Sequence, residues 1–287
     1  MDAARAPDPR LSEQLLTACT RGLTELALLL LRRGADVGHT RADGWTPLMA
    51  ACSNGHSAAA RVLVEHRADL AVAASDGFTA LMEACTNGHR DVAGLLVGSG
   101  ADVAQASADG TAPLILAGLY GHVEVASLLM ACRADPLQVT QRGCTAFRAA
   151  CGNGHAAVVA PLLQSAGLDA ASEEAVVGFV SACANGHACV VQHLLEYGVS
   201  ATAAAEDGTS ALARACMASH REVAALLIGA RADADTELGA LRHKNLSGAR
   251  RVMERARQEV VQAADRAQET RDLDALLCDI EGPAPRP

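Results

Sequence analysis

The sequence predicts an all-α solenoid of stacked helix–turn–helix units that are joined by β-turn or hairpin loops. Three observations support this fold class. A short motif recurs about every 33 residues along most of the chain. Each period contains two short segments with apolar residues at helical spacing. Half of the 287 residues are hydrophobic, yet only one Trp, two Tyr and three Phe are present. Such a core of small aliphatic residues and Cys suits thin, closely packed layers.

The recurring motif is Asn-Gly-His. It begins at Asn54, Asn87, Asn153 and Asn185. The related triplets Tyr-Gly-His and Ala-Ser-His, which begin at Tyr120 and Ala218, complete the series. Self-similarity at a fixed period of this length indicates a repeat architecture. We therefore expect six repeats, with the bounds 43–75, 76–108, 109–141, 142–173, 174–206 and 207–239.

Each repeat carries the same local signals, and the first shows them most completely. Asp43 and Gly44 favour a turn, because Gly tolerates a positive φ angle. Pro47 suits the first position of a helix, where its missing N–H has no partner to lose. Gly55 ends this short helix, and the apolar residues 62–64 belong to a second one. Two such short helices cannot bury their apolar faces alone, so neighbouring repeats must stack.

The segment from Asp76 to His89, with Val92–Leu96 after it, closely resembles the ankyrin-repeat motif. The resemblance recurs at a fixed period from Ser12 to Gly239. It implies an ankyrin-repeat solenoid whose function is to bind another macromolecule, without catalysis.

Two repeats depart from the pattern. Repeat five lacks the Asp-Gly turn, and repeat four is one residue short with Pro161 inside its predicted second helix. A proline there removes a hydrogen bond and clashes with the preceding turn. We expect a distorted or loosened joint around residues 160–178.

The two ends are predicted to differ from the repeats, because a solenoid needs polar covers. The expected segments are a disordered N-terminus at 1–11, an N-terminal capping repeat at 12–42, a degenerate capping repeat at 240–257, a charged helical tail at 258–281 and a disordered end at 282–287. Small apolar residues recur in the tail near a 3.5-residue period. A helix that leans on the last repeat is preferred over a coiled-coil seam, because seams rich in Ala are weak.

Charge and hydropathy exclude several functions. From Leu11 to Gly239 there are 13 basic and 23 acidic residues, a net charge of −10, which argues against nucleic acid as a partner. The start of the chain lacks the apolar segment of a signal peptide, and the run Leu26–Leu31 is too short to cross a membrane. Ten cysteines without a secretion signal indicate reduced thiols. We therefore expect an intracellular protein, cytoplasmic or nuclear, with no membrane partner.

The sequence offers one cluster that could hold a metal. Cys183, His187, Cys189 and His193 fall within eleven residues, and zinc prefers such ligands. However, Cys recurs at a small buried position of the repeat and His at a second fixed position, and Cys183 and Cys189 flank a turn. We expect no metal, no cofactor and no enzymatic activity. A Cys-based redox- or metal-responsive protein is an alternative, and the cysteines outside the repeat position are expected to be exposed, at Cys132, Cys144 and Cys278.

The family resemblance implies that a partner binds the concave face made by the turn tips and the first helices. Carried over by position in the repeat, this face includes Trp45, Ser53, Asn54, Phe78, Thr86, Asn87, Leu119, Tyr120 and Asn153. Three of these residues are aromatic, and aromatic side chains are favoured binding anchors. The alternative is that Trp45 and Phe78 only cover the adjacent turn.

Four acidic residues flank the predicted face, at Asp43, Asp76, Glu83 and Asp109. We therefore expect a monomeric scaffold or adaptor that binds a protein or peptide of basic and apolar character through repeats one to three. An alternative is a regulatory module that is dimerised or recruited through its C-terminal helix.

Overall fold

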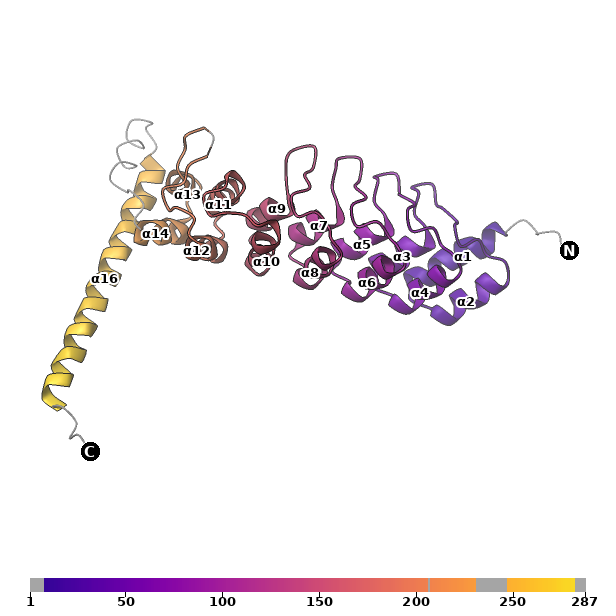
Figure 1. Cartoon of the computed structure of the whole chain (residues 1–287), viewed down its shortest axis with the longest axis horizontal. Helices are drawn as coiled ribbons and strands as arrows, with labels where there is room; N and C mark the ends of the chain where they lie inside the picture. Colours follow the sequence, from indigo (N-terminus) through magenta and orange to yellow (C-terminus); the bar gives the residue numbers. More distant parts are fainter. Residues whose placement is uncertain (1–7, 206, 231–246, 282–287) are drawn as a thin grey trace. The chain divides into compact units, whose positions relative to one another are not determined.

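The computed structural model describes residues 8–205, 207–230 and 247–281 (Figure 1). Within these ranges the chain is built from helices, and its only strand-like pairing is two isolated bridges, Ala73 with Thr79 and Ala204 with Ser210. The chain divides between Leu168 and Asp169 into two compact parts. We call them the N-terminal body and the C-terminal body. The all-α prediction is confirmed.

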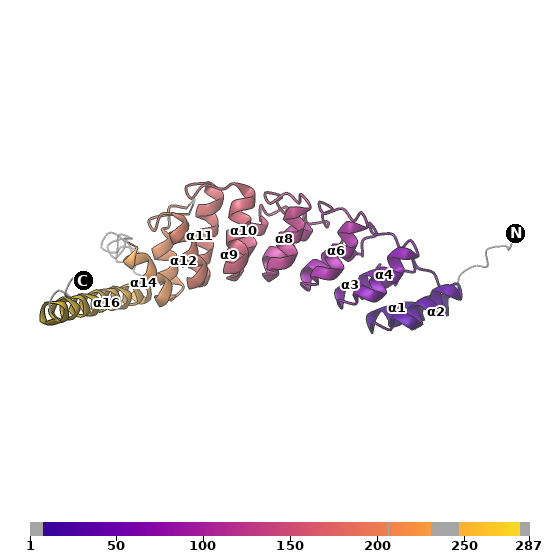
Figure 2. The same cartoon turned by 60° about the horizontal axis from the view of Figure 1, so that its bottom comes forward.

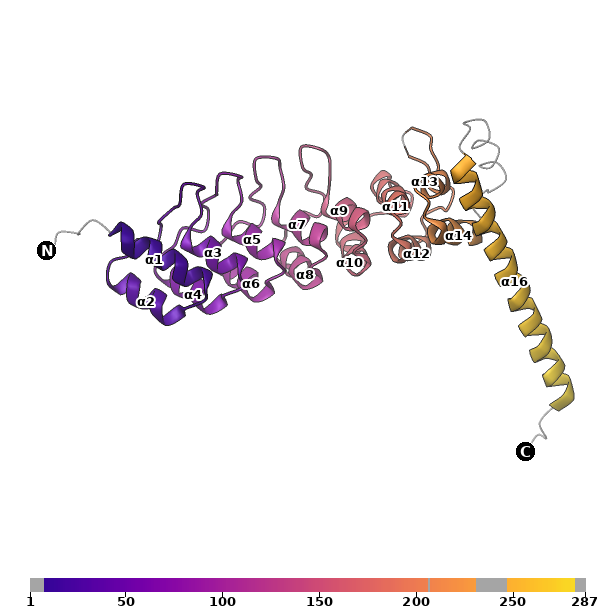
Figure 3. The ribbon, with the colours of Figure 1, turned by 180° about the vertical axis from the view of Figure 1, so that it is seen from behind.

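The N-terminal body contains helices in consecutive pairs. Their bounds are α1 Pro9–Thr20, α2 Thr24–Arg32, α3 Pro47–Ser53, α4 Ser57–Glu65, α5 Ala80–Thr86, α6 Arg90–Gly98, α7 Pro113–Tyr120, α8 Val123–Ala131, α9 Ala146–Asn153 and α10 Ala156–Ala166. The first helix of each pair packs on the first helix of the next, and the second helices pack likewise (Figures 1 and 2). Long loops project from the row of first helices, as the view from behind also shows (Figure 3).

Three of the first helices, α3, α5 and α9, begin directly after a capping threonine. The hydroxyl oxygens of Thr46, Thr79 and Thr145 accept hydrogen bonds from backbone N–H groups three residues later, at 3.1, 3.3 and 3.1 Å. Each bond satisfies one of the N–H groups that a helix start leaves without a partner. Pro47 and Pro113 lie in the first turn, as their missing N–H allows.

The histidines of the Asn-Gly-His and related triplets join one repeat to the one before it. In the N-terminal body the Nε2 atom of each ring donates to a backbone carbonyl 36 residues earlier, at 3.1 Å from His56 to Thr20, 3.1 Å from His89 to Ser53, 2.9 Å from His122 to Thr86 and 2.9 Å from His155 to Leu119. A carbonyl only accepts, so Nε2 carries the hydrogen. The ring lies against the glycine of the preceding triplet. A Cβ atom on Gly121 would lie 2.4 Å from Nδ1 of His155.

In its described residues, the C-terminal body contains two helix pairs and a long last helix. The bounds are α11 Glu173–Asn185, α12 Ala188–Tyr197, α13 Ala211–Met217, α14 Arg221–Gly229 and α16 Ser247–Glu281. Helix α16 packs on α13 and α14, where Ala249, Met253 and Ala256 are buried. In this body too, the ring of His220 donates to the carbonyl of Ala184, at 3.0 Å.

The joint expected around residues 160–178 takes a different form from the one predicted. Helix α10 continues through Pro161 without interruption. In place of the missing Asp-Gly turn, α11 starts early, with Ser172 as its cap and Glu173 and Glu174 in its first turn, where carboxylates suit the helix dipole. The boundary between the two bodies lies within this segment.

Two predicted segment bounds are wrong. Helix α1 begins at Pro9, so residues 9–11 are not disordered; the Asp8 carboxylate caps this helix by accepting from the Arg10 N–H at 2.9 Å. Residues 247–257 do not form a capping repeat, because they begin the same continuous helix that contains the predicted tail. The expectations for residues 1–7, 240–246 and 282–287 lie outside the described residues.

Candidate partner-binding surfaces

The loops before the first helices are held by their aspartates. In the N-terminal body the Oδ1 atoms of Asp43, Asp76 and Asp109 accept backbone hydrogen bonds from the residues two positions later, at 3.1, 3.0 and 3.1 Å. Neighbouring loops are also tied to each other. Both the backbone N–H and the hydroxyl of Ser75 donate to the carbonyl of Asp43, at 2.9 and 2.6 Å. The loop tips are thus ordered parts of the stack.

The three predicted aromatic anchors do not form one cluster. Trp45 and Phe78 are half-buried and lie in the loops just before the N-terminal ends of α3 and α5. Tyr120 is 48% exposed and lies at the opposite, C-terminal end of α7. Its ring stacks on His122, with 6.4 Å between the ring centroids. A partner that contacts all three aromatic residues therefore has to extend along the length of a first helix and also across neighbouring repeats.

The asparagines on the predicted face also hold the fold. Asn54, Asn87 and Asn153 are exposed, and their side-chain amides donate to the carbonyls four residues earlier, at 2.8, 2.9 and 2.8 Å. These bonds close the ends of α3, α5 and α9. These helix-end bonds alone account for asparagine at the three positions.

The remaining predicted residues are half-buried and contribute backbone atoms to the stack. The carbonyls of Ser53, Thr86 and Leu119 accept the histidine bonds described above. The hydroxyl of Thr86 is buried and makes no hydrogen bond. The hydroxyl of Ser53 accepts from the Asn87 amide at 3.3 Å.

The burial of Glu83 is a feature of this face that the sequence did not predict. The residue is only 9% exposed, on the first helix α5, where the equivalent positions are occupied by Ala50, Leu116 and Ala149. Burial raises the pKa of the Glu83 carboxyl and nearby Asp76 raises it further, while a hydrogen bond with Ser53 opposes the shift. The carboxylate is therefore desolvated and next to a second negative charge.

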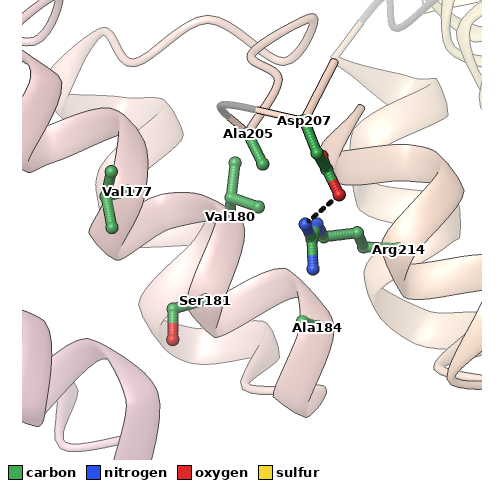
Figure 4. Close-up of a pocket in the computed structure, with 7 residues that line it drawn as sticks. All are labelled: Val177, Val180, Ser181, Ala184, Ala205, Asp207 and Arg214. Carbon is green, nitrogen blue, oxygen red and sulfur yellow. Dashed lines mark hydrogen bonds and ion pairs between the residues drawn. The ribbon is translucent and has the colours of Figure 1, made fainter. Parts of the chain in front are cut away.

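The C-terminal body contains a groove that sequence reasoning missed (Figure 4). Its volume is about 650 Å³, and it is lined by Val177, Val180, Ser181, Ala184, Ala205, Asp207 and Arg214. Side chains from α11 line one wall, and the loop before α13 and α13 itself line the other. The available signal was Arg214, a charged residue at the repeat position that Glu83 occupies earlier in the chain.

The cysteines and histidines whose side chains are described do not converge on a metal site. Where side chains are described, no three His, Cys, Asp or Glu residues are placed to hold an ion together. Cys183 is buried and Cys189 is exposed, on opposite sides of the turn. Cys132 and Cys144 are half-buried instead of exposed. The side chain of Cys278 lies outside the description.

A stack of helix pairs, linked by ordered loops and by side-chain bonds between successive pairs, defines a helical-repeat protein. The family model for ankyrin repeats (three copies) matches residues 15–107 and 95–173, which together span more than half of the chain. The chain belongs to the ankyrin-repeat family, whose repeats generally mediate protein–protein interaction and are generally non-catalytic. No curated protein matches the sequence significantly. Among the described residues, no helix is both long and apolar enough to cross a membrane.

Proposed function

We propose that this protein is a non-catalytic intracellular scaffold or adaptor, and that its first three repeats bind a partner segment carrying a basic residue. The observation that carries the proposal is the desolvated carboxylate of Glu83 beside Asp76. Such a carboxylate is poorly stabilised in the free protein, so a cation that reaches it gains a strong electrostatic interaction.

The surroundings of Glu83 favour a lysine or arginine within an apolar segment. Trp45 and Phe78 lie in the two loops before α3 and α5, and each is partly exposed. Aromatic faces attract cations and also cover aliphatic side chains. Asp43 and Asp76 are exposed in the same loops and add negative potential. Together these groups match a segment of basic and apolar character.

The first experiment isolates the partner, by capture from cell extract on the full-length chain and mass spectrometry. The affinity of the purified partner is then measured for the wild type, for Glu83→Gln and for Trp45→Ala/Phe78→Ala. Glu124→Gln is the matched control, because Glu124 is exposed on the second helix α8. We expect Glu83→Gln to weaken binding about tenfold, equivalent to about 1.4 kcal/mol, and Glu124→Gln to leave it unchanged. Equal effects of the two Glu→Gln changes would place the site elsewhere.

A second candidate function is supported by helix α16. After Ala256 the helix no longer has buried side chains in its described part, and residues 261–268 are exposed, with Val261 52% exposed. This segment is available to recruit a second factor or a second copy. Sedimentation of the full chain over a wide concentration range tests dimerisation, and Val261→Glu should abolish any dimer that forms through this segment.

We also infer that the ankyrin repeats extend beyond the matched residues. The support is the repetition of the same helix pair in α11–α12 and α13–α14, with the same histidine bond from His220. The six-repeat division of residues 43–239 remains a prediction. Scanning hydrogen exchange of the full chain would test it, because each repeat should exchange as a unit.

A further inference from the structure

The groove of the C-terminal body combines apolar walls with one incompletely paired cation. Val177, Val180 and Ala184 on α11 and Ala205 in the loop before α13 supply the apolar surface (Figure 4). The side chain of Arg214 reaches into the groove from α13. A volume of about 650 Å³ is within the range of sites that hold a drug-sized ligand or a few peptide residues.

Arg214 is paired with Asp207 through only one of its nitrogen atoms. The Nη2 atom donates to Oδ2 of Asp207 at 2.9 Å. The other carboxylate oxygen, Oδ1, accepts the backbone N–H of Thr209 at 2.9 Å as part of the turn. The pairing with Asp207 is therefore single, in place of the two-pronged pairing that arginine makes best with a carboxylate. The Nε atom of Arg214 is buried without a hydrogen-bond partner.

We propose that this groove binds an extended acidic segment of a partner protein, with an aliphatic side chain against Val180 and Ala184 and an Asp or Glu carboxylate on Arg214. In the free protein Asp207 substitutes for the partner's carboxylate. Its side chain is 59% exposed, so it can turn toward solvent when a carboxylate with both oxygens available takes its place. Asp207 thus lowers the affinity for the partner segment by competing with its carboxylate for the Arg214 guanidinium.

This site differs in charge from the one proposed on the first three repeats. Glu83 is the fourth residue after its cap Thr79, and Arg214 is the fourth residue after its cap Ser210. The same repeat position thus carries a carboxylate in one body and a guanidinium in the other. The C-terminal groove therefore selects a partner segment of opposite charge, and its proposal does not depend on the first site.

The test uses the full-length chain with ¹³C-labelled valine methyl groups and two capped peptides as probes. They are Ac-Ser-Leu-Ser-Glu-Ser-NH₂ and its Gln counterpart, which differ only in the charge. We expect the Glu peptide to shift the methyl signals of Val177 and Val180 and to bind at least about fivefold more tightly than the Gln peptide. A difference of this size between the two peptides is measurable by NMR titration, even when the dissociation constants are millimolar.

Three variants separate the roles of the charged groups. Asp207→Asn keeps an acceptor for Thr209 but releases Arg214, so the Glu peptide should bind several-fold more tightly. Arg214→Gln should remove the preference for Glu over Gln. Arg251→Gln is the matched control, because Arg251 is exposed on α16 and its loss changes the net charge equally. It should leave both affinities unchanged.

Four outcomes would overturn the proposal. They are equal binding of the two peptides, a preference that survives Arg214→Gln, weaker binding by Asp207→Asn, and no binding of the Glu peptide to either the wild type or Asp207→Asn. Circular dichroism and urea unfolding establish that each variant is folded before it is titrated. A negative result here leaves the capture experiment on Glu83 unaffected, because the two sites lie in different bodies.

Discussion

Replacing Gly121 with Ala tests the contact by which one repeat holds the next. Gly121 has a φ angle of +77°, and an added Cβ atom would lie 2.4 Å from Nδ1 of His155. That distance is far below a van der Waals contact, so the imidazole ring must move. Movement of the ring would break its 2.9 Å bond to the carbonyl of Leu119.

The magnitude follows from three costs. A left-handed backbone costs an Ala about 1–2 kcal/mol, the lost hydrogen bond about 1 kcal/mol, and the displaced ring about 1–3 kcal/mol of overpacking. Gly143→Ala is the matched control, because Gly143 has a φ angle of +71° and nothing within 4 Å of the added Cβ. It should show the backbone cost alone, so Gly121→Ala is expected to destabilise by at least about 2 kcal/mol more.

Urea unfolding of the full chain, followed by helical circular dichroism, measures both variants. A double-mutant cycle with His155→Ala isolates the contact, since removal of the ring should reduce the cost of Gly121→Ala to that of Gly143→Ala. The reasoning is refuted if the two Gly→Ala variants are equally destabilised, or if His155→Ala leaves the cost of Gly121→Ala unchanged.

Three further predictions concern other parts of the chain. Because burial raises the pKa of the Glu83 carboxyl, ionisation of this group opposes folding. The stability that the protonated carboxyl provides is fully present below its unfolded-state pKa and is lost as the pH rises through its folded-state pKa. Thermal unfolding of Glu83→Gln should therefore occur at a higher temperature than that of the wild type at pH 7, and at a similar temperature near pH 4. In a Cys278→Ser background, mass-resolved alkylation should modify exposed Cys189 first and the buried repeat cysteines only upon unfolding, since burial raises the pKa of thiols such as Cys19 to about 12; early modification of a buried thiol would contradict the packing. Met253→Ala should destabilise by about 2–5 kcal/mol in urea unfolding, because this side chain is fully buried, whereas Val261→Ala should change stability by less than about 0.5 kcal/mol.

The repeat architecture was predictable because its signals are local and recur. Thr46, Thr79 and Thr145 cap three of the first helices, Ser172 and Ser210 cap two more, and each cap acts on a backbone N–H only three residues away. Comparison of equivalent positions in the repeats also predicted that the recurring cysteine is a small buried residue. Gly118 shows why this position must be small, since a Cβ atom there would lie 2.4 Å from the carbonyl oxygen of Ala146. Six copies of one weak pattern therefore gave the fold class without any tertiary information.

The errors arose where a residue's role depends on what packs beside it. Residues 247–257 were expected in a capping repeat, but they belong to α16, which buries Met253 and Ala256 where it packs on α13 and α14. Pro161 was expected to distort or loosen the joint around it, yet α10 continues, because a proline removes only one of the helix hydrogen bonds while the buried apolar face remains.

For the binding surfaces, the sequence determined which residues face the loops and the first helices, because the repeat period fixes each position. It did not determine which charges are stabilised there. Glu83 and Arg214 occupy the same repeat position, but only the packing around each decides that one carboxylate is desolvated and that one guanidinium keeps a buried N–H without a partner. The physical reason is that turns, caps and helical faces depend on neighbours along the chain, whereas the desolvation of a side chain also depends on what the stacked neighbouring repeats place over it.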